Sequence, residues 1–159
     1  MDPRDIDLPT LTSLAGNGVV RRVLADLAGE GYAGVRVSHG YLFQRLLDTE
    51  PTITELAESL GMTQQGASKQ VRELEELGFV ERRPVSGDGR VRCVRLTERG
   101  RGVVDAGRRA RAALEAEVVD MVGARDVRAA REVLAALLEV TGLGDDVRTR
   151  RVPLPPPGL

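Results

Sequence analysis

The sequence predicts a mainly α-helical protein that carries one small β-hairpin. Apolar residues recur at three- and four-residue spacings over most of the chain, as they do in amphipathic helices. The exception is residues 79–96, where two short runs rich in β-forming residues flank a turn-rich stretch, which is the pattern of a hairpin. With 159 residues and 42% hydrophobic composition, the chain suits a single domain, residues 1–159, with its own core.

Periodicity and glycine breaks define the first two predicted helices. Residues 8–29 carry apolar side chains on one helical face, although Gly16 and Gly18 weaken the pattern in its middle. Glycines then interrupt the pattern before a second helix, for which we expect Ser38 to be the N-cap. That helix ends near residues 48–51.

The next two predicted helices are joined by a tight turn. A short helix begins after Thr52, which forms a capping-box pattern with Glu55, and it stops at Gly61. Thr63 is the next cap candidate, and the helix that follows it stops at Gly78. The sequence therefore predicts two helices in a helix-turn-helix arrangement.

Two further helices follow the hairpin. Thr97 can cap a long, highly charged helix that runs to about residue 121, and Gly123 interrupts it before a last amphipathic helix. Residues 146–159 contain arginines and four prolines, so we expect a flexible Arg/Pro-rich tail.

The fourth predicted helix exposes a polar face suited to reading base edges. Glutamine can pair with adenine, lysine or arginine with guanine, and serine with a phosphate or a base. The acids of this helix lie in its C-terminal half, which fits entry into the major groove by the N-terminal end. The alternative is an ordinary solvated helix face. The candidate DNA-binding residues of this helix are Thr63, Gln64, Gln65, Ser68, Lys69 and Arg72.

The hairpin adds local positive charge to a chain whose formal net charge is -1. Residues 82–101 contain seven arginines and two acids. Arg90, flanked by the glycine-bearing tip, is the candidate for the minor groove, and Arg82 and Arg92 are candidates for phosphate contacts. The alternative for Arg90 is a solvated loop arginine.

Five short motifs run through the predicted helices and the hairpin: Ile53-Thr54-Glu55-Leu56-Ala57, Thr63-Gln64-Gln65-Gly66-Ala67-Ser68-Lys69, Leu74-Glu75-Glu76-Leu77-Gly78, Asp88-Gly89-Arg90 and Leu96-Thr97-Glu98-Arg99-Gly100. Together they resemble the MarR family of bacterial winged helix-turn-helix regulators over roughly residues 38–102. The resemblance implies a winged helix-turn-helix DNA-binding lobe at 38–97, in which the hairpin is the wing, and a helical dimerisation region at 8–36 and 98–145. It implies a homodimer that places one recognition helix in each half-site of a pseudo-palindromic operator in double-stranded DNA. It also implies that Asp88 orients the wing.

The same resemblance implies a small aromatic or phenolic effector bound between the dimer helices and the DNA-binding lobe. For His39, the only histidine, a surface or capping position is the alternative to a role in the pocket. The residues of the possible ligand pocket are Tyr32, Arg36, His39, Tyr41 and Phe43.

Other functions find little support in the sequence. One histidine and one cysteine fall short of a metal site, and we expect no cofactor and no enzymatic activity, because no nucleophile and base pair is apparent. Cys93 is expected to be a buried thiol, with a redox sensor as the alternative. Without a signal-peptide pattern or a membrane-spanning segment, the chain is expected to be cytoplasmic.

These patterns predict a sequence-specific DNA-binding transcriptional regulator, in particular a repressor that a small-molecule ligand releases. The physical basis is a shift in population between two spacings of the recognition helices, only one of which fits successive major grooves. The alternative is a winged-helix module that binds small molecules or proteins without specific DNA binding, which the neutral net charge favours.

Overall fold

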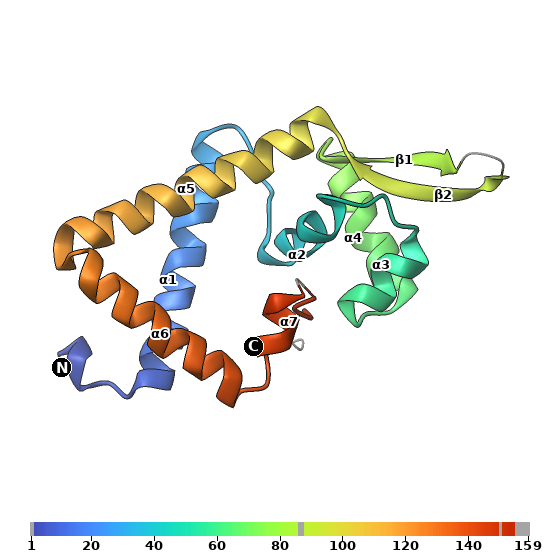
Figure 1. The fold of residues 1–159 in the computed structure, drawn as a ribbon. Coiled ribbons are helices and arrows are strands. Elements are labelled where there is room, and N and C mark those ends of the chain that lie inside the picture. The colour runs from blue at the N-terminus through green and yellow to red at the C-terminus, as the bar shows by residue number, and fades with distance from the viewer. Residues whose placement is uncertain (1, 86–87, 150, 155–159) are drawn as a thin grey trace.

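A computed structural model describes residues 2–85, 88–149 and 151–154, with backbone alone at 85 and 88–90. It confirms the predicted class, mainly α with one hairpin. At one end of the elongated molecule lie α2, α3, α4 and the hairpin, and α1, α5 and α6 extend away from them (Figure 1). The elements are η1 Pro3–Asp5, α1 Leu8–Gly29, α2 Val37–Leu46, α3 Ile53–Leu60, α4 Gln64–Glu76, β1 Val80–Val85, β2 Asp88–Leu96, α5 Glu98–Val122, α6 Ala124–Val140 and α7 Gly144–Arg148.

Side-chain caps begin three of these helices where the sequence predicts them. The Thr52 hydroxyl accepts the Glu55 backbone N–H, and the Glu55 carboxylate accepts the Thr52 N–H at 2.7 Å, which completes the capping box. Thr63 and Thr97 cap α4 and α5 in the same way, each accepting from the backbone three residues on. These local bonds set the boundaries of the helix-turn-helix.

Helix α2 begins two residues earlier than a Ser38 cap would allow. Its N-cap is Arg36, and Ser38 lies within the first turn. The reason is His39, whose Nδ1 accepts the Arg36 backbone N–H at 3.2 Å, much as a glutamate at that position does in a capping box. The capping interpretation of His39 is therefore correct.

The hairpin pairs antiparallel strands and is tied to the start of α3. Val80 lies opposite Leu96, and Arg83 lies opposite Cys93. An isolated bridge joins Thr52 to Cys93, and the Val94 N–H donates to the Pro51 carbonyl at 2.8 Å. The stem of the wing is thus held against the helix-turn-helix.

The core is centred on Phe79, which is fully buried at the junction of α4 and β1. The Phe43 ring contacts it edge-on at 6.1 Å between centroids, and Tyr32 lies at 6.3 Å. The Arg99 guanidinium lies over both Tyr32 and Phe79 and donates to the Leu77 carbonyl at the end of α4. These contacts join the α1–α2 linker, α2, α4 and α5.

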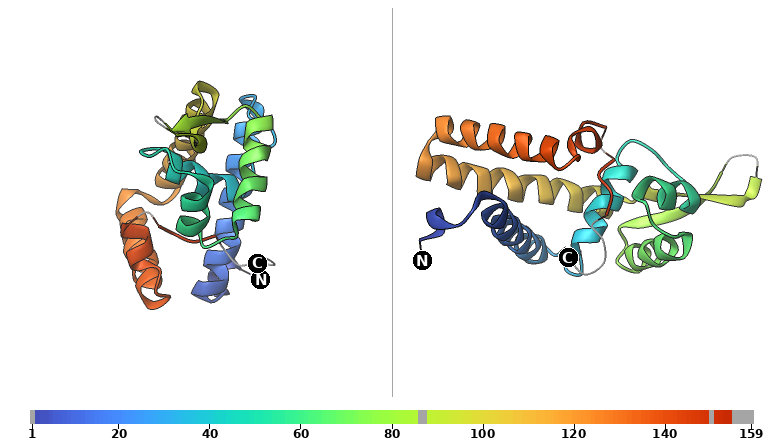
Figure 2. Two further views of the ribbon diagram at one scale, coloured as in Figure 1. Left: turned by 90° about the vertical axis from the view of Figure 1, so that its right-hand side faces the viewer. Right: turned by 90° about the horizontal axis from the view of Figure 1, so that it is seen from below.

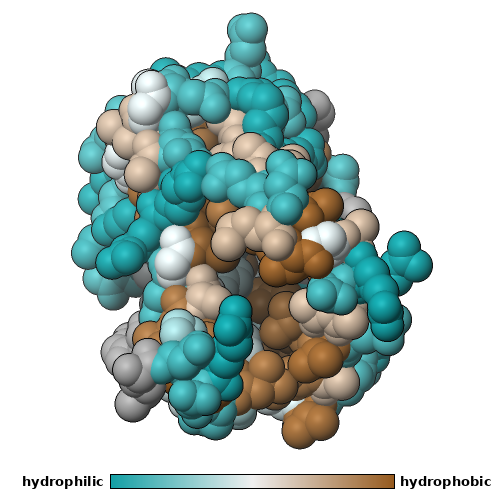
Figure 3. Space-filling view, turned by 90° about the vertical axis from the view of Figure 1, so that its left-hand side faces the viewer, coloured by the Kyte–Doolittle hydropathy of each residue, from teal (hydrophilic) through white to brown (hydrophobic). Residues whose placement is uncertain are grey.

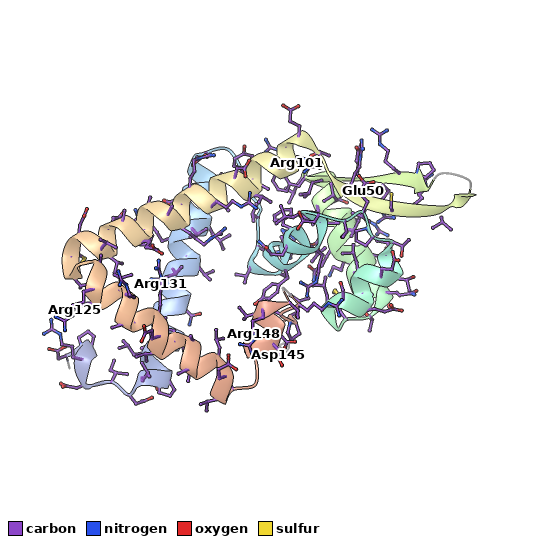
Figure 4. The ribbon with its side chains drawn as sticks, in the orientation of Figure 1. Glu50, Arg101, Arg125, Arg131, Asp145 and Arg148 are labelled. Carbon is purple, nitrogen blue, oxygen red and sulfur yellow. The ribbon has the colours of Figure 1, made fainter. Side chains whose placement is uncertain are left out.

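The C-terminal segment returns to the DNA-binding lobe. Instead of a tail that is flexible from residue 146, residues 144–148 form α7, where Arg148 pairs with Glu139 at 2.5 Å (Figure 4). Arg45 on α2 donates to the carbonyl of Val152 at 3.3 Å, and Leu154 packs against the core. Apolar residues between the prolines explain this attachment, which composition alone does not indicate.

One end of the molecule leaves apolar side chains uncovered. Helix α6 buries none of its residues, although it is amphipathic. Figure 3 shows apolar side chains gathered on the end of the molecule that faces away from the hairpin, and Figure 2 shows α6 lying alongside α5. The exposed apolar residues of α1, α5 and α6 include Leu8, Leu14, Val19, Val118, Met121, Val122, Val133, Leu134 and Val140.

Among the described residues, no helix is long and apolar enough to cross a membrane.

Candidate nucleic-acid interface

Helix α4 presents its predicted polar face to solvent. Its opposite face carries Ala67, Val71 and Leu74, which are all fully buried. Packing of that face leaves Gln65, Lys69 and Arg72 exposed, with Ser68 partly buried. Two of the candidates also have structural roles. Thr63 is the N-cap of the helix, and the Gln64 amide donates to the Thr54 hydroxyl at 2.9 Å.

Two acids of α4 are neutralised from neighbouring elements. Glu73 pairs with Arg36, which precedes α2, and Glu75 pairs with Arg82 on β1 at 3.2 Å. Arg82 is partly buried, so its guanidinium is engaged with α4 and is less available to a phosphate than the sequence suggests. The acid-rich half of α4 is thereby less repulsive to a polyanion.

The wing carries less free charge than its arginine content predicts. Glu81, one residue before the basic segment, accepts from Arg95 at 2.6 Å and from Arg83 at 3.3 Å. The hydrogen bond from Arg95 lowers the pKa of Glu81, so this acid stays ionised. Arg92 is exposed opposite Pro84. The side chains of Asp88 and Arg90 lie outside those that the structure describes.

An apolar cavity of about 190 Å³ lies among α1, α2 and α5. Of the five predicted ligand-pocket residues, only Arg36 and Phe43 line it. Most of its wall comes from residues that the sequence does not single out: Val19, Val20, Val23, Leu24, Leu27, Val35, Val37, Gly40, Gln44, Val103, Val104, Gly107 and Arg111.

The other three predicted pocket residues lie elsewhere. Tyr41 faces a second cavity, between α2 and the C-terminal segment. His39 lines a shallow pocket against α4 together with Arg36. Tyr32 packs on Phe79, and its hydroxyl lies where a side chain at Gly102 would be, 2.5 Å from an added Cβ. The structure therefore does not bring the five residues together in one site.

Residues 34–91, which span α2, α3, α4, β1 and the start of β2, match the model of the MarR family. Over these residues the chain is similar to the MarR family. Solved structures agree with this likeness in fold. A MarR family transcription regulator is 24% identical, with 85% of each chain covered and a TM-score of 0.63.

Two further likenesses are to DNA complexes. Streptococcus pneumoniae FabT in complex with DNA is 20% identical over 84% of this chain and 94% of that chain, with a TM-score of 0.68. A mutant of S. aureus MepR bound to an oligodeoxyribonucleotide is 18% identical over 86% of this chain and 99% of that chain, with a TM-score of 0.60. A search of the curated proteins finds no match. At these identities the likeness shows that the chain shares their fold.

Cys93 is buried, as expected. Its thiol lies 3.5 Å from the Arg83 carbonyl and 3.7 Å from a carboxylate oxygen of Glu50, which lies beside the hairpin (Figure 4). The nearby Arg95 is paired with Glu81. Because reactive cysteines are partly exposed to solvent, the burial of this thiol weighs against the redox-sensor alternative. Among the described residues no cluster suitable for a metal ion is found.

Burial of His39 predicts a loss of stability in acid. Burial, and to a smaller extent the charge of Arg36, lowers the pKa of His39 from 6.5 to about 4. The acids that line the same pocket are Glu73 and Glu76. Because the unfolded chain binds the proton more tightly, stability falls as pH drops from about 6.5 to 4. Denaturant unfolding at several pH values measures the free energy of unfolding. In His39→Gln its fall over this pH range should be smaller than in the wild type by on the order of 3 kcal/mol. Equal pH profiles for the two proteins would contradict the assignment.

Proposed function

We propose that the protein is a sequence-specific DNA-binding transcriptional regulator. The observation that carries the proposal is the surface of α4, where Gln65, Lys69 and Arg72 are exposed. Arg36 and Arg82 hold two acids of the same helix away from that face. The likeness in fold to two DNA complexes supports the proposal.

The regulator acts as a homodimer on a pseudo-palindromic operator. The uncovered apolar face of α1, α5 and α6 supports this, because an isolated soluble chain rarely leaves such a face in water. A two-fold dimer places one α4 in each of two major grooves about one helical turn apart. In each wing, Asp88 orients the tip, Arg90 enters the minor groove and Arg92 contacts phosphate.

A small molecule releases this regulator, which is a cytoplasmic repressor. The cavity among α1, α2 and α5 supports this step, because it lies where the helical region meets the DNA-binding lobe. A small apolar ligand, aromatic or phenolic, could favour one arrangement of the helical region relative to the DNA-binding lobe. It would thereby shift the spacing of the two recognition helices in the dimer.

The decisive experiment is binding to duplex DNA from the promoter region beside the gene, titrated against salt. The protein should bind in a sequence-dependent and salt-sensitive way, and Arg90→Ala should weaken binding about tenfold or more. Arg125→Ala is the matched control, because Arg125 lies on α6 at the far end of the molecule (Figure 4). Weak binding that ignores sequence would overturn the proposal in favour of a module that binds small molecules or proteins.

Truncation of Lys69 and Arg72 should act through phosphate and base contacts from α4. Both side chains are exposed on the face opposite the buried residues, so Lys69→Ala and Arg72→Ala should leave the Tm unchanged. Each loss of a phosphate contact should reduce the slope of log K against log salt by about 1. Salt slopes equal to the wild-type value in both variants would remove these residues from the interface.

A further inference from the structure

One arginine joins the ends of two helices to the start of a third. Arg99 lies in the first turn of α5, and its guanidinium donates to the Gly31 carbonyl at 2.8 Å and to the Leu77 carbonyl at 3.3 Å. Gly31 follows the last turn of α1, and Leu77 is the C-cap of α4. The side chain therefore connects α1 and α5, which carry part of the uncovered apolar face, with the helix that we expect to read DNA.

Two aromatic rings hold this guanidinium in place. Its central carbon lies 5.3 Å from the centroid of the Tyr32 ring and 5.2 Å from that of the Phe79 ring. Because the guanidinium is planar and its donors point in fixed directions, the rings and the two carbonyls together determine its orientation. The Arg99 side chain is nevertheless exposed on its outer side, so its replacement leaves no cavity in the core.

Arg99 holds the backbone of α4, whereas the other two arginines bonded to this helix hold its side chains. Arg36 and Arg82 pair with carboxylates of α4, which can change rotamer and follow a movement of the helix. A bond to the carbonyl of the C-cap fixes the end of the helix itself. The C-terminal ends of helices carry partial negative charge, so the ends of both α1 and α4 are stabilised by this one cation.

The position of Arg99 argues against a direct contact with DNA. It is bonded to the C-terminal end of α4, and we expect the N-terminal end to enter the major groove. Helix α4 spans Gln64–Glu76, and at 1.5 Å per residue its two ends lie about 20 Å apart. Arg99 can therefore influence base reading through the placement of the helix.

We propose that Arg99 is a positioning residue, which fixes the orientation of α4 relative to α1 and α5 and thereby the spacing of the two recognition helices in the dimer. The inference rests on the proposed function, in which a dimer reads DNA through α4. Without Arg99, each lobe keeps its own reading surface, but the two lobes take a wider range of spacings. Only a fraction of these spacings fits successive major grooves, and affinity for two half-sites falls with that fraction.

The arrangement of the helices is measured first, without DNA. Nitroxide labels at Arg21→Cys on α1 and Lys69→Cys on α4, in a Cys93→Ser background, give a distribution of separations by double electron–electron resonance. Both labelled positions are exposed, and an excess of unlabelled chain leaves one labelled copy in each dimer. Arg99→Gln should broaden this distribution, because glutamine is shorter and has a single amide nitrogen to donate from. A distribution as narrow as that of the wild type would overturn the inference.

Arg108→Gln is the matched control for the loss of charge. Arg108 is also exposed on α5, but its ion pair is with an acid of the same helix, three residues away. This variant should give the wild-type distribution of separations. Broadening of the same size in Arg108→Gln would mean that the contacts of Arg99 with α1 and α4 are not the cause.

DNA binding then separates positioning from direct contact. Each unlabelled variant is titrated at low salt, well below its Tm, with a complete operator and with a duplex that carries one half-site. Arg99→Gln should bind the complete operator at least about tenfold more weakly and the half-site within about twofold of the wild type. A spacer longer by about two base pairs should weaken the wild type more than Arg99→Gln, because the lobes of the variant are not held at one spacing.

The remaining outcomes are distinct. Equal losses on the two duplexes would identify Arg99 as a DNA contact and contradict a positioning role, and so would unchanged affinity for both. If Arg99→Gln broadens the distribution of separations while the wild type does not distinguish the operator from unrelated DNA, the proposed function fails and the role of Arg99 in fixing α4 stands.

Discussion

Gly100→Ala should destabilise the protein by on the order of 3 kcal/mol or more. Gly100 lies in the first turn of α5 and is buried against the segment that joins α4 to β1. An added Cβ would overlap the Phe79 backbone carbonyl and would lie 3.1 Å from a Leu96 methyl group. A backbone carbonyl cannot rotate away as a side chain can, and this one also accepts the Thr97 N–H at 3.1 Å. Thermal and urea unfolding monitored by circular dichroism would measure the loss.

Gly107→Ala is the control for this prediction. Gly107 is also buried on α5, but an added Cβ would meet only the mobile end of the Arg111 side chain, at 3.4 Å. Alanine is favoured over glycine within a helix by up to about 1 kcal/mol, so this variant should be as stable as wild type or slightly more stable. Similar losses in the two variants would show that any side chain on this face is disruptive and that the Phe79 carbonyl is not the cause.

Leu134→Asp should convert the protein to a monomer and reduce operator affinity at least about a hundredfold. Leu134 is 42% exposed on α6, within the apolar face that the described residues leave open to solvent. A charge placed in a dimer interface must be desolvated without a partner, which costs several kcal/mol. Multi-angle light scattering gives the mass, and titration with a complete operator and with a half-site gives the loss of affinity.

Arg128→Glu controls for the change of charge on α6. Arg128 is exposed on the same helix and lies outside the set of exposed apolar residues, so this variant should remain dimeric. A Leu134→Asp protein that keeps the mass of a dimer would show that copies of the chain associate through another surface.

Helix boundaries were predictable because helix caps are local. The hydroxyls of Thr52, Thr63 and Thr97 bond to backbone only three residues away, so a short stretch of sequence contains both partners. The start of α2 was missed because a histidine takes the place of the usual capping carboxylate, and no common pattern signals it.

The pairing of charges was not predictable in the same way. Arg36 and Glu73 are distant in sequence, and their contact depends on how α2 packs against α4. The charge count of residues 82–101 excluded Glu81, which neutralises two strand neighbours. A count along the chain therefore overstates the charge that a wing presents, because cross-strand pairing depends on register.

The residues predicted to line one ligand pocket lie in different places because of helical geometry. Residues 39, 41 and 43 are alternate positions, which on a helix point in different directions, about 200° apart at each step. His39 faces α4, Tyr41 the C-terminal segment, and Phe43 the cavity and the core. The rest of the cavity comes from α1 and α5, and their approach to α2 is a property of the folded chain.

The bond between Arg45 and the Val152 carbonyl has a mechanical consequence. The DNA-binding lobe is continuous with α1 through residues 30–36 and with α5 at Thr97, and residues 151–154 after α7 hold it at a third place, on α2. Each attachment removes some of the directions in which one rigid part can tilt against another. The residues after α7 therefore restrict how the lobe can tilt relative to α5 and α6.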